Sequence, residues 1–254
     1  MIPARYASTR FPGKPLIDLQ GKPMVVRVAE RAAQSSASRV VVATDDVRIA
    51  DACMRAHVGV IMTRSNHATG TDRLSEVATQ LGLPDDAVVV NVQGDEPLIP
   101  ALVIDQVAAL LQQRAHAAMA TFCHAIHDVA DAINPNVVKC ALNEAGEAMY
   151  FSRAPIPYAR DDWQGGVNAV PASLPMYRHI GLYAYRASFL RIFPTLAIPG
   201  IERFEALEQL RALAHGYRIA VSVVDAPLPP GIDTPEDYQR LRELYSANGE
   251  SFFT

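Results

Sequence analysis

The chain has 254 residues, half of them hydrophobic, and a net charge of −4 with a pI near 6.0. This length predicts one large domain or two small ones, and the acidic balance argues against nucleic acid or an anionic membrane as a partner. The cysteines Cys53, Cys123 and Cys140 lie far apart without a C-x-x-C motif, which argues against a disulfide framework or a zinc site and favours a reducing cytosol. Because no apolar run spans a membrane and no signal peptide opens the chain, we expect a cytoplasmic protein.

The first distinctive stretch is a basic loop, residues 3–15, between an apolar start and a predicted amphipathic helix. It combines cations, hydroxyls and a turn: Arg5, Arg10, Lys14, Ser8, Thr9 and Pro12-Gly13. A loop beside a helix N-terminus favours anions, because free backbone N–H groups and the helix dipole both point toward it. We therefore interpret the loop as a cradle for a polyphosphate rather than a solvated basic tail.

Strand and helix signals alternate through the first half of the chain. Short β-branched runs predict strands at 39–43, 58–62 and 87–92, and periodic segments predict helices at 23–34, from Thr44-Asp45-Asp46 to about 56, 69–81 and 100–113. Such alternation is typical of right-handed βαβ units on a mostly parallel sheet.

The pattern changes after about residue 117. Longer strands are predicted at 119–125, 137–142, 148–154, 177–185 and 217–224, one helix at 202–215, and a final helix after the cap at Asp233 or Thr234. The Gly- and Pro-rich residues 161–175 predict a loop. The second half is therefore expected to extend the sheet and add a small antiparallel lobe.

Two polar groups follow predicted strands, where ligands bind in open α/β sheets. They are Gln93-Gly94-Asp95-Glu96 and the segment around Asp233. Carboxylates beside a polyanion usually need a divalent cation between them, and magnesium binds one or two carboxylates plus phosphate oxygens. Asp95 and Asp233 are the expected ligands, although each alone is also explained as a helix cap. The chain contains neither a Walker A motif nor G-x-G-x-x-G.

Several motifs, in order, closely resemble the bacterial 3-deoxy-manno-octulosonate (Kdo) cytidylyltransferase family. The blocks span nearly the whole chain: 3–16, Ala43-Thr-Asp-Asp46, Gly70-Thr-Asp-Arg-Leu74, Asn91-Val-Gln-Gly-Asp-Glu-Pro97, Tyr150-Phe-Ser-Arg-Ala154, Tyr177-Arg-His-Ile-Gly-Leu-Tyr183, Leu207-Glu-Gln-Leu-Arg211 and Gly231-Ile-Asp-Thr-Pro-Glu-Asp237. The resemblance implies a three-layer α/β/α fold of the nucleotide-diphospho-sugar transferase type, with a mostly parallel sheet and a small antiparallel lobe. Residues 1–254 would form one nucleotidyltransferase domain, with a core at about 1–117 and 217–254. The sugar-binding and dimerisation lobe would occupy about 118–216.

The resemblance also implies a reaction and its residues. CTP and Kdo would give CMP-Kdo and pyrophosphate with Mg²⁺, in a homodimer that supplies lipopolysaccharide biosynthesis. The implied nucleotide-binding residues are Ala4, Arg5, Ser8, Arg10, Lys14, Arg73 and Gln93, and the implied sugar-binding residues are Arg153, His179, Tyr183, Glu208 and Gln209. Arg10, Lys14, Asp95 and Asp233 would be catalytic, and both aspartates would bind the metal.

Other interpretations remain open at this stage. The nearest alternative is a cytidylyltransferase for a sialic acid-like sugar. A glycosyltransferase would favour a D-x-D motif at a strand end, and a catalytically dead regulator would lack one of the four catalytic residues. His179, Tyr183 and Glu208 also suit an ordinary semi-polar core layer. Because the family has an apolar run before Pro3 and only Met1-Ile2 stand here, we expect the biological start a few codons upstream.

Overall fold

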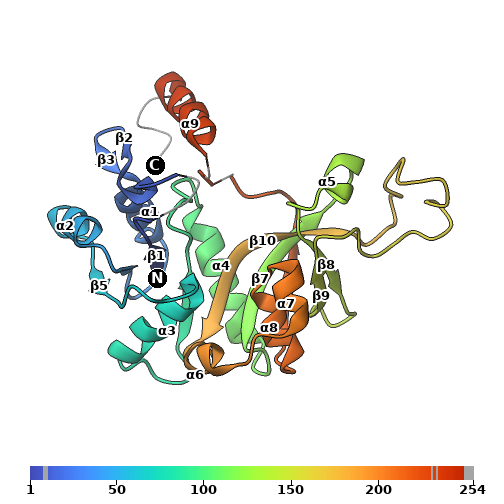
Figure 1. The fold of residues 1–254 in the computed structure, drawn as a ribbon, viewed down its shortest axis with the longest axis horizontal. Helices are drawn as coiled ribbons and strands as arrows, with labels where there is room; N and C mark the ends of the chain where they lie inside the picture. The colour runs from blue at the N-terminus through green and yellow to red at the C-terminus, as the bar shows by residue number, and fades with distance from the viewer. Residues whose placement is uncertain (8–10, 230, 233, 249–254) are drawn as a thin grey trace.

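The computed structural model describes residues 1–7, 11–229, 231–232 and 234–248 (Figure 1). Its first strands form a parallel sheet in the order β1-β4-β5. These strands are β1 (Ile2–Ala4), β4 (Val42–Thr44) and β5 (Val60–Met62). The sequence pattern predicted β4 and β5, since short β-branched runs between helices are typical of buried parallel strands.

A larger sheet has the order β11-β7-β10-β8-β9. Its strands are β6 (Val88–Asn91), β7 (Met119–Ala125), β8 (Lys139–Leu142), β9 (Ala148–Ser152), β10 (Tyr177–Arg186) and β11 (Ile219–Val224). β8 pairs with the start of β10, at Tyr177 and Arg178, and β6 pairs with its end, from Tyr183 to Arg186. Only β7 and β11 run parallel here, because β10 is antiparallel to β6, β7 and β8. The prediction of a mostly parallel sheet therefore holds for the first sheet and is wrong for the second.

The two sheets meet at the first residue. The nitrogen of Met1 donates to the carbonyl of Val90 at 2.8 Å, and the nitrogen of Val92 donates to the carbonyl of Met1 at 3.0 Å. These bonds set β1 beside the carboxyl end of β6, so the loops that follow the two strands leave the same edge.

Helices cover both faces, as a three-layer fold requires. The described chain includes α1 (Met24–Ala32), α2 (Val47–Arg55), α3 (Gly70–Gln80), α4 (Ala101–Gln113), α5 (Val129–Ile133), α6 (Ala187–Ile192), α7 (Gly200–Glu205), α8 (Gln209–Ala214) and α9 (Pro235–Asn248). It also has the small hairpin β2 (Asp18–Leu19) and β3 (Lys22–Pro23), with short 3-10 turns at Lys14–Leu16 and Phe193–Thr195. Helices α1, α2 and α4 share one hydrophobic cluster and α3, α6 and α8 share another, which confirms the α/β/α layering.

One predicted helix is broken in two. The expected helix at 202–215 ends at Glu205 and resumes at Gln209. Ala206 lies between them in the left-handed region with φ of 51°, where a continuous right-handed helix cannot pass. The break gives Leu207 and Glu208 a direction that a single helix would not allow.

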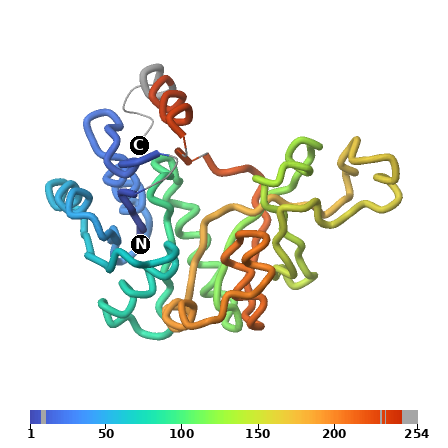
Figure 2. The backbone as a smooth tube through the Cα atoms, viewed as in Figure 1, coloured from blue at the N-terminus to red at the C-terminus, as the bar shows by residue number. Residues whose placement is uncertain are grey.

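The segment between β9 and β10 forms an arm that extends away from both sheets (Figures 1 and 2). Residues 161–175 contain no helix or strand, as predicted. Trp163 is nevertheless fully buried in a small separate cluster, and its indole N–H donates to the carbonyl of Ala169 at 2.7 Å. In the described part of the chain, no helix is long and apolar enough to cross a membrane.

Candidate active site

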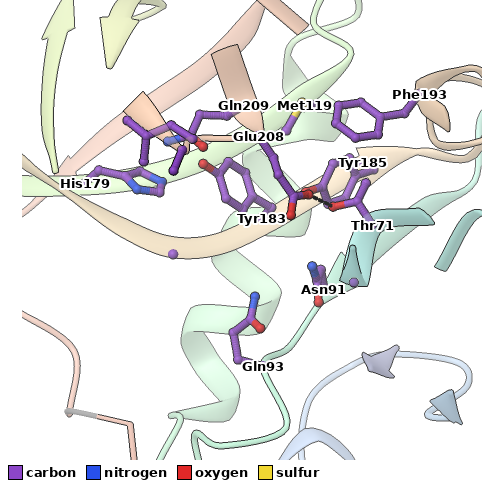
Figure 3. A pocket seen from close by; sticks show the side chains of 14 residues that line it. Thr71, Asn91, Gln93, Met119, His179, Tyr183, Tyr185, Phe193, Glu208 and Gln209 are labelled. Carbon is purple, nitrogen blue, oxygen red and sulfur yellow. Dashed lines mark hydrogen bonds between the residues drawn. The ribbon is translucent and has the colours of Figure 1, made fainter. Parts of the chain in front are cut away.

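A cavity of about 310 Å³ opens between β10, the N-terminus of α3 and the turn before α8 (Figure 3). It brings together five of the residues that the sequence predicted for binding: Gln93, His179, Tyr183, Glu208 and Gln209. Gln93 was expected on the nucleotide side and the other four on the sugar side. One cavity thus joins residues that lie more than 100 positions apart.

Strand β10 supplies one wall. His179, Tyr183 and Tyr185 line the cavity and form a row of rings whose successive centroids lie 5.1 and 5.8 Å apart. The Nε2 atom of His179 lies 3.1 Å from the hydroxyl of Thr121 on β7. Burial lowers the pKa of His179 to about 3, so its imidazole is neutral near pH 7.

Glu208 enters the cavity from the turn that Ala206 creates. The hydroxyl of Thr71 donates to its Oε2 at 3.1 Å. Thr71 is held in place because a capping box between Thr69 and Asp72 fixes the start of α3. Burial raises the pKa of Glu208, and the hydrogen bond from Thr71 opposes this shift.

Two buried polar atoms beside this pair lack a hydrogen-bond partner in the described chain. They are the Oδ1 of Asn91 and the hydroxyl of Tyr183. Asn91 lies opposite Tyr183 in the β6–β10 register, and Figure 3 shows it between Gln93 and the Thr71–Glu208 pair. Buried polar groups are nearly always paired, so these two atoms are available to pair with a bound molecule.

A second group of predicted residues meets at the edge shared by β1 and β6. The ammonium of Lys14 lies 2.5 Å from Oδ2 of Asp95. Gly94 allows the loop to approach β1, because a Cβ there would lie 2.9 Å from the carbonyl oxygen of Pro3. The nitrogen of Ile232 donates to the backbone carbonyl of Asp95 at 2.8 Å, which places Ile232 beside this loop.

Arg73 and Arg5 flank the carboxyl ends of the parallel strands. The Arg73 side chain is fully buried, and its Nη2 lies 2.8 Å from Oδ1 of Asp45. Its Nε has no hydrogen-bond partner within the described chain, and burial lowers the pKa of this guanidinium. Arg5 donates to the carbonyl of His67 at 2.7 Å. Ala4 ends β1 and is buried.

Three predicted residues, Ser8, Arg10 and Asp233, lie outside the described residues. Arg153 lies outside the cavity lining: its guanidinium donates to the carbonyls of Glu205 at 2.6 Å and Pro135 at 2.8 Å. Among the described residues, no group of three or more His, Cys, Asp or Glu side chains could hold a metal. The Asp95 carboxylate faces the ammonium of Lys14, and magnesium sites in proteins typically combine one or two carboxylates with phosphate oxygens.

Sequence reasoning did not select Thr71, Asn91 or Tyr185. Asn91 lies one residue before the end of the predicted strand 87–92 and begins one of the blocks that resemble the family, so its place near a carboxyl strand end was an available signal. Thr71 also lies in one of these blocks, but its contact with Glu208 joins residues 137 positions apart. Tyr185 gave no such signal, because it reaches the cavity only through the pairing of the sheet.

The fold and site define a nucleotidyltransferase of the cytidylyltransferase class. The family model described as "Cytidylyltransferase" matches residues 1–219. The chain belongs to this family and, within it, to the 3-deoxy-manno-octulosonate cytidylyltransferases. Proteins of that name from Marinobacter nauticus and Herminiimonas arsenicoxydans are 56% and 55% identical to it over 98% and 97% of this chain, and over 97% and 98% of their own lengths.

Solved structures agree with the fold. The structure of a CMP:2-keto-3-deoxy-manno-octonic acid synthetase complexed with CTP is 39% identical, with a TM-score of 0.88 over 98% of both chains. A cytidylyltransferase from Leptospira borgpetersenii has a TM-score of 0.65 at 18% identity, covering 100% of this chain and 88% of that one. The second likeness supports the fold alone.

Proposed function

We propose that the chain transfers CMP from CTP to Kdo, giving CMP-Kdo and pyrophosphate. The observation that carries this proposal is the shared cavity, in which Gln93 stands beside His179, Tyr183, Glu208 and Gln209. The names of the relatives at 55–56% identity and of the CTP-bound neighbour support the same reaction.

The chemistry requires positioning and charge neutralisation more than covalent catalysis. The anomeric hydroxyl of the sugar attacks the α-phosphorus of CTP, the bond to the β-phosphate oxygen breaks, and pyrophosphate leaves. Lys14, together with Arg10, would hold the β- and γ-phosphates and stabilise the charge on the leaving group. Lys14 is already held at this edge by Asp95.

Asp95 and Asp233 would hold Mg²⁺ with phosphate oxygens. When bound, the metal would polarise the phosphate and lower the pKa of the attacking hydroxyl. Arg5, Ser8 and Arg73 would bind the nucleotide with Ala4 and Gln93. The buried Arg73 guanidinium supports this role, since its Nε lacks a hydrogen-bond partner within the described chain.

The sugar would bind against His179, Tyr183, Glu208 and Gln209, with Arg153 pairing with its carboxylate. Arg153 would have to leave the carbonyl of Pro135 to do so, whereas the other four already line the cavity. A neutral His179 and a carboxylate at Glu208 are suited to hydroxyl groups.

We further propose that the protein acts as a cytoplasmic homodimer in lipopolysaccharide biosynthesis. Large apolar side chains are exposed on the lobe and on α7, above all Met149 at 63% and Phe204 at 95%. Such exposed side chains support a protein–protein contact there. Sedimentation of Phe204→Glu against the unchanged chain would test the dimer.

A pyrophosphate-release assay tests the reaction. We expect release only with CTP, Kdo and Mg²⁺ together, and none with ATP, GTP or UTP in place of CTP. Turnover with sialic acid but not Kdo would overturn the sugar assignment. Absence of release with every nucleotide and sugar pair would overturn the reaction.

A further inference from the structure

Asn91 and Tyr183 form a cross-strand pair on one face of the sheet. They are direct neighbours in the antiparallel register of β6 and β10, and both line the cavity. Side chains of directly opposed residues lie about 4.5–5.5 Å apart at Cβ. Two polar groups are therefore presented side by side to the same ligand space.

One oxygen of each residue is unpaired within the described protein, although the Asn91 side chain also contacts the Tyr185 hydroxyl. Asn91 is 4% exposed and Tyr183 is 8% exposed, yet the Oδ1 of Asn91 and the hydroxyl of Tyr183 have no hydrogen-bond partner there. Leaving a buried polar atom unpaired destabilises the folded state. Two such atoms side by side indicate that a ligand supplies the partners.

The neighbours indicate which ligand this is. His179 and Glu208 line the cavity together with Tyr183, and Gln93 lines it from the loop that follows β6 (Figure 3). Tyr183 stands next to His179 in the row of rings. Asn91 lies opposite Tyr183 and lines the same cavity, so we expect it to contact the molecule that His179 and Tyr183 bind. An amide oxygen accepts hydrogen bonds, and a sugar offers hydroxyl donors.

We infer that Asn91 is a specificity-determining residue that accepts a hydrogen bond from a sugar hydroxyl, beside the one bound by Tyr183. This inference deepens the proposed function and rests on it. The pair would discriminate between sugars by the presence of hydroxyl groups at two adjacent positions. A site built to bind a hydroxyl rejects an analogue that lacks it, because its own polar group then stays unpaired.

The test compares Asn91→Leu with the same substitution at an asparagine whose side-chain oxygen and nitrogen are both hydrogen-bonded within the protein. We expect Asn91→Leu to raise the KM for Kdo on the order of tenfold or more, with the KM for CTP unchanged. Its melting temperature should fall by no more than about 4 °C, because the change removes an unpaired oxygen together with one contact to the Tyr185 hydroxyl. Asn143 is the matched control: its side chain makes three hydrogen bonds, to Ala145, Glu147 and the Glu147 carboxylate. Asn143→Leu should lower the melting temperature without changing the KM for either substrate.

Deoxy analogues of Kdo identify the contact. The wild-type enzyme should have a much higher KM for an analogue that lacks one particular hydroxyl than for Kdo. In Asn91→Leu this difference should disappear, while the differences for the other deoxy analogues should remain. Tyr183→Phe should lose it for a neighbouring hydroxyl.

The possible failures are distinguishable. An active wild-type enzyme with an unchanged Kdo KM in Asn91→Leu would overturn this inference and leave the proposed function standing. A raised KM for CTP instead would place Asn91 on the nucleotide and overturn it too. A wild-type protein without pyrophosphate release would overturn both.

Discussion

The ammonium of Lys14 and the carboxylate of Asp95 lie 2.5 Å apart, although 81 residues separate them in the chain. Their contact joins the basic loop to the loop that follows β6. The sequence assigned the first to phosphates and the second to a metal. The ion pair places the residue expected to bind phosphate directly against the residue expected to bind the metal.

Asp95→Asn should remove most turnover, by about two orders of magnitude or more, because the amide is a poor ligand for Mg²⁺. The fold should survive, since the Asp95 side chain is 27% exposed and its backbone carbonyl still accepts from Ile232. Pyrophosphate release over a Mg²⁺ titration measures the first effect and circular dichroism the second. A rate near that of the wild type would refute the metal assignment.

Tyr6 and Arg48 should position the start of the 3-10 turn that carries Lys14. The guanidinium of Arg48 lies 3.3 Å from the centroid of the Tyr6 ring, and Asp46 holds it through bonds of 2.9 and 2.6 Å. The nitrogen of Gly13 donates to the carbonyl of Tyr6 at 3.0 Å. We expect Tyr6→Leu and Arg48→Gln to raise the KM for CTP several-fold, since a cation–π contact contributes about 0.5–1 kcal/mol at exposed sites.

Two control variants separate the Tyr6–Arg48 contact from general effects of substitution. Tyr6→Phe keeps the ring and should behave almost as the wild type does. Arg55→Gln removes an exposed charge from the same helix and should change no kinetic constant. If the KM for Kdo rose as much as the KM for CTP, the substitutions would be disrupting the whole active site and not only the position of the turn that carries Lys14.

Arg211→Ala should destabilise the fold by about 3–5 kcal/mol, because it leaves a buried carboxylate without its partner. Nε and Nη2 of Arg211 donate to the two oxygens of Glu202 at 2.8 and 2.5 Å, and both side chains are buried. Urea denaturation measures the loss. Arg160→Ala breaks a pair with Asp161 that is fully in solvent and should lower stability by less than about 1 kcal/mol. Similar losses in the two variants would contradict this account.

His179 should make stability fall as the medium becomes acidic. Its pKa is about 3 in the fold because burial disfavours the charged ring, whereas an unfolded histidine titrates near 6.5. Between these values the unfolded chain binds a proton that the folded chain does not. Stability is therefore retained above pH 6.5 and lost as the pH falls, by about 2 kcal/mol between pH 7 and pH 5.

His179→Gln removes this group, so the free energy of unfolding should vary less with pH than in the wild type over the same range. Chemical denaturation of both proteins at pH 5, 6 and 7 gives the difference between their slopes. Identical slopes would show that the fold does not lower the pKa of His179. Glu76 makes no difference to this comparison, because its pKa of about 2 is the same in both proteins.

Local pattern alone determined most helices and strands. β7 lies at the predicted residues, and β6 and α4 differ by only one or two positions at their ends. Periodicity and β-branching are local properties, and each of these segments buries its apolar residues where its pattern requires. The ordered motifs likewise determined the family, because they resemble it residue by residue.

Tertiary structure alone decided how β10 pairs, where the last helix of the lobe breaks, and which polar groups meet. Strand pairing depends on contacts between distant segments, so the insertion of β10 between β6 and β7 leaves no local signal. Ala206 adopts a positive φ that its own side chain disfavours, and only its surroundings can impose it. Asn91 and Tyr183 become a pair through register alone, because no spacing in the sequence states that two residues 92 positions apart share one cavity.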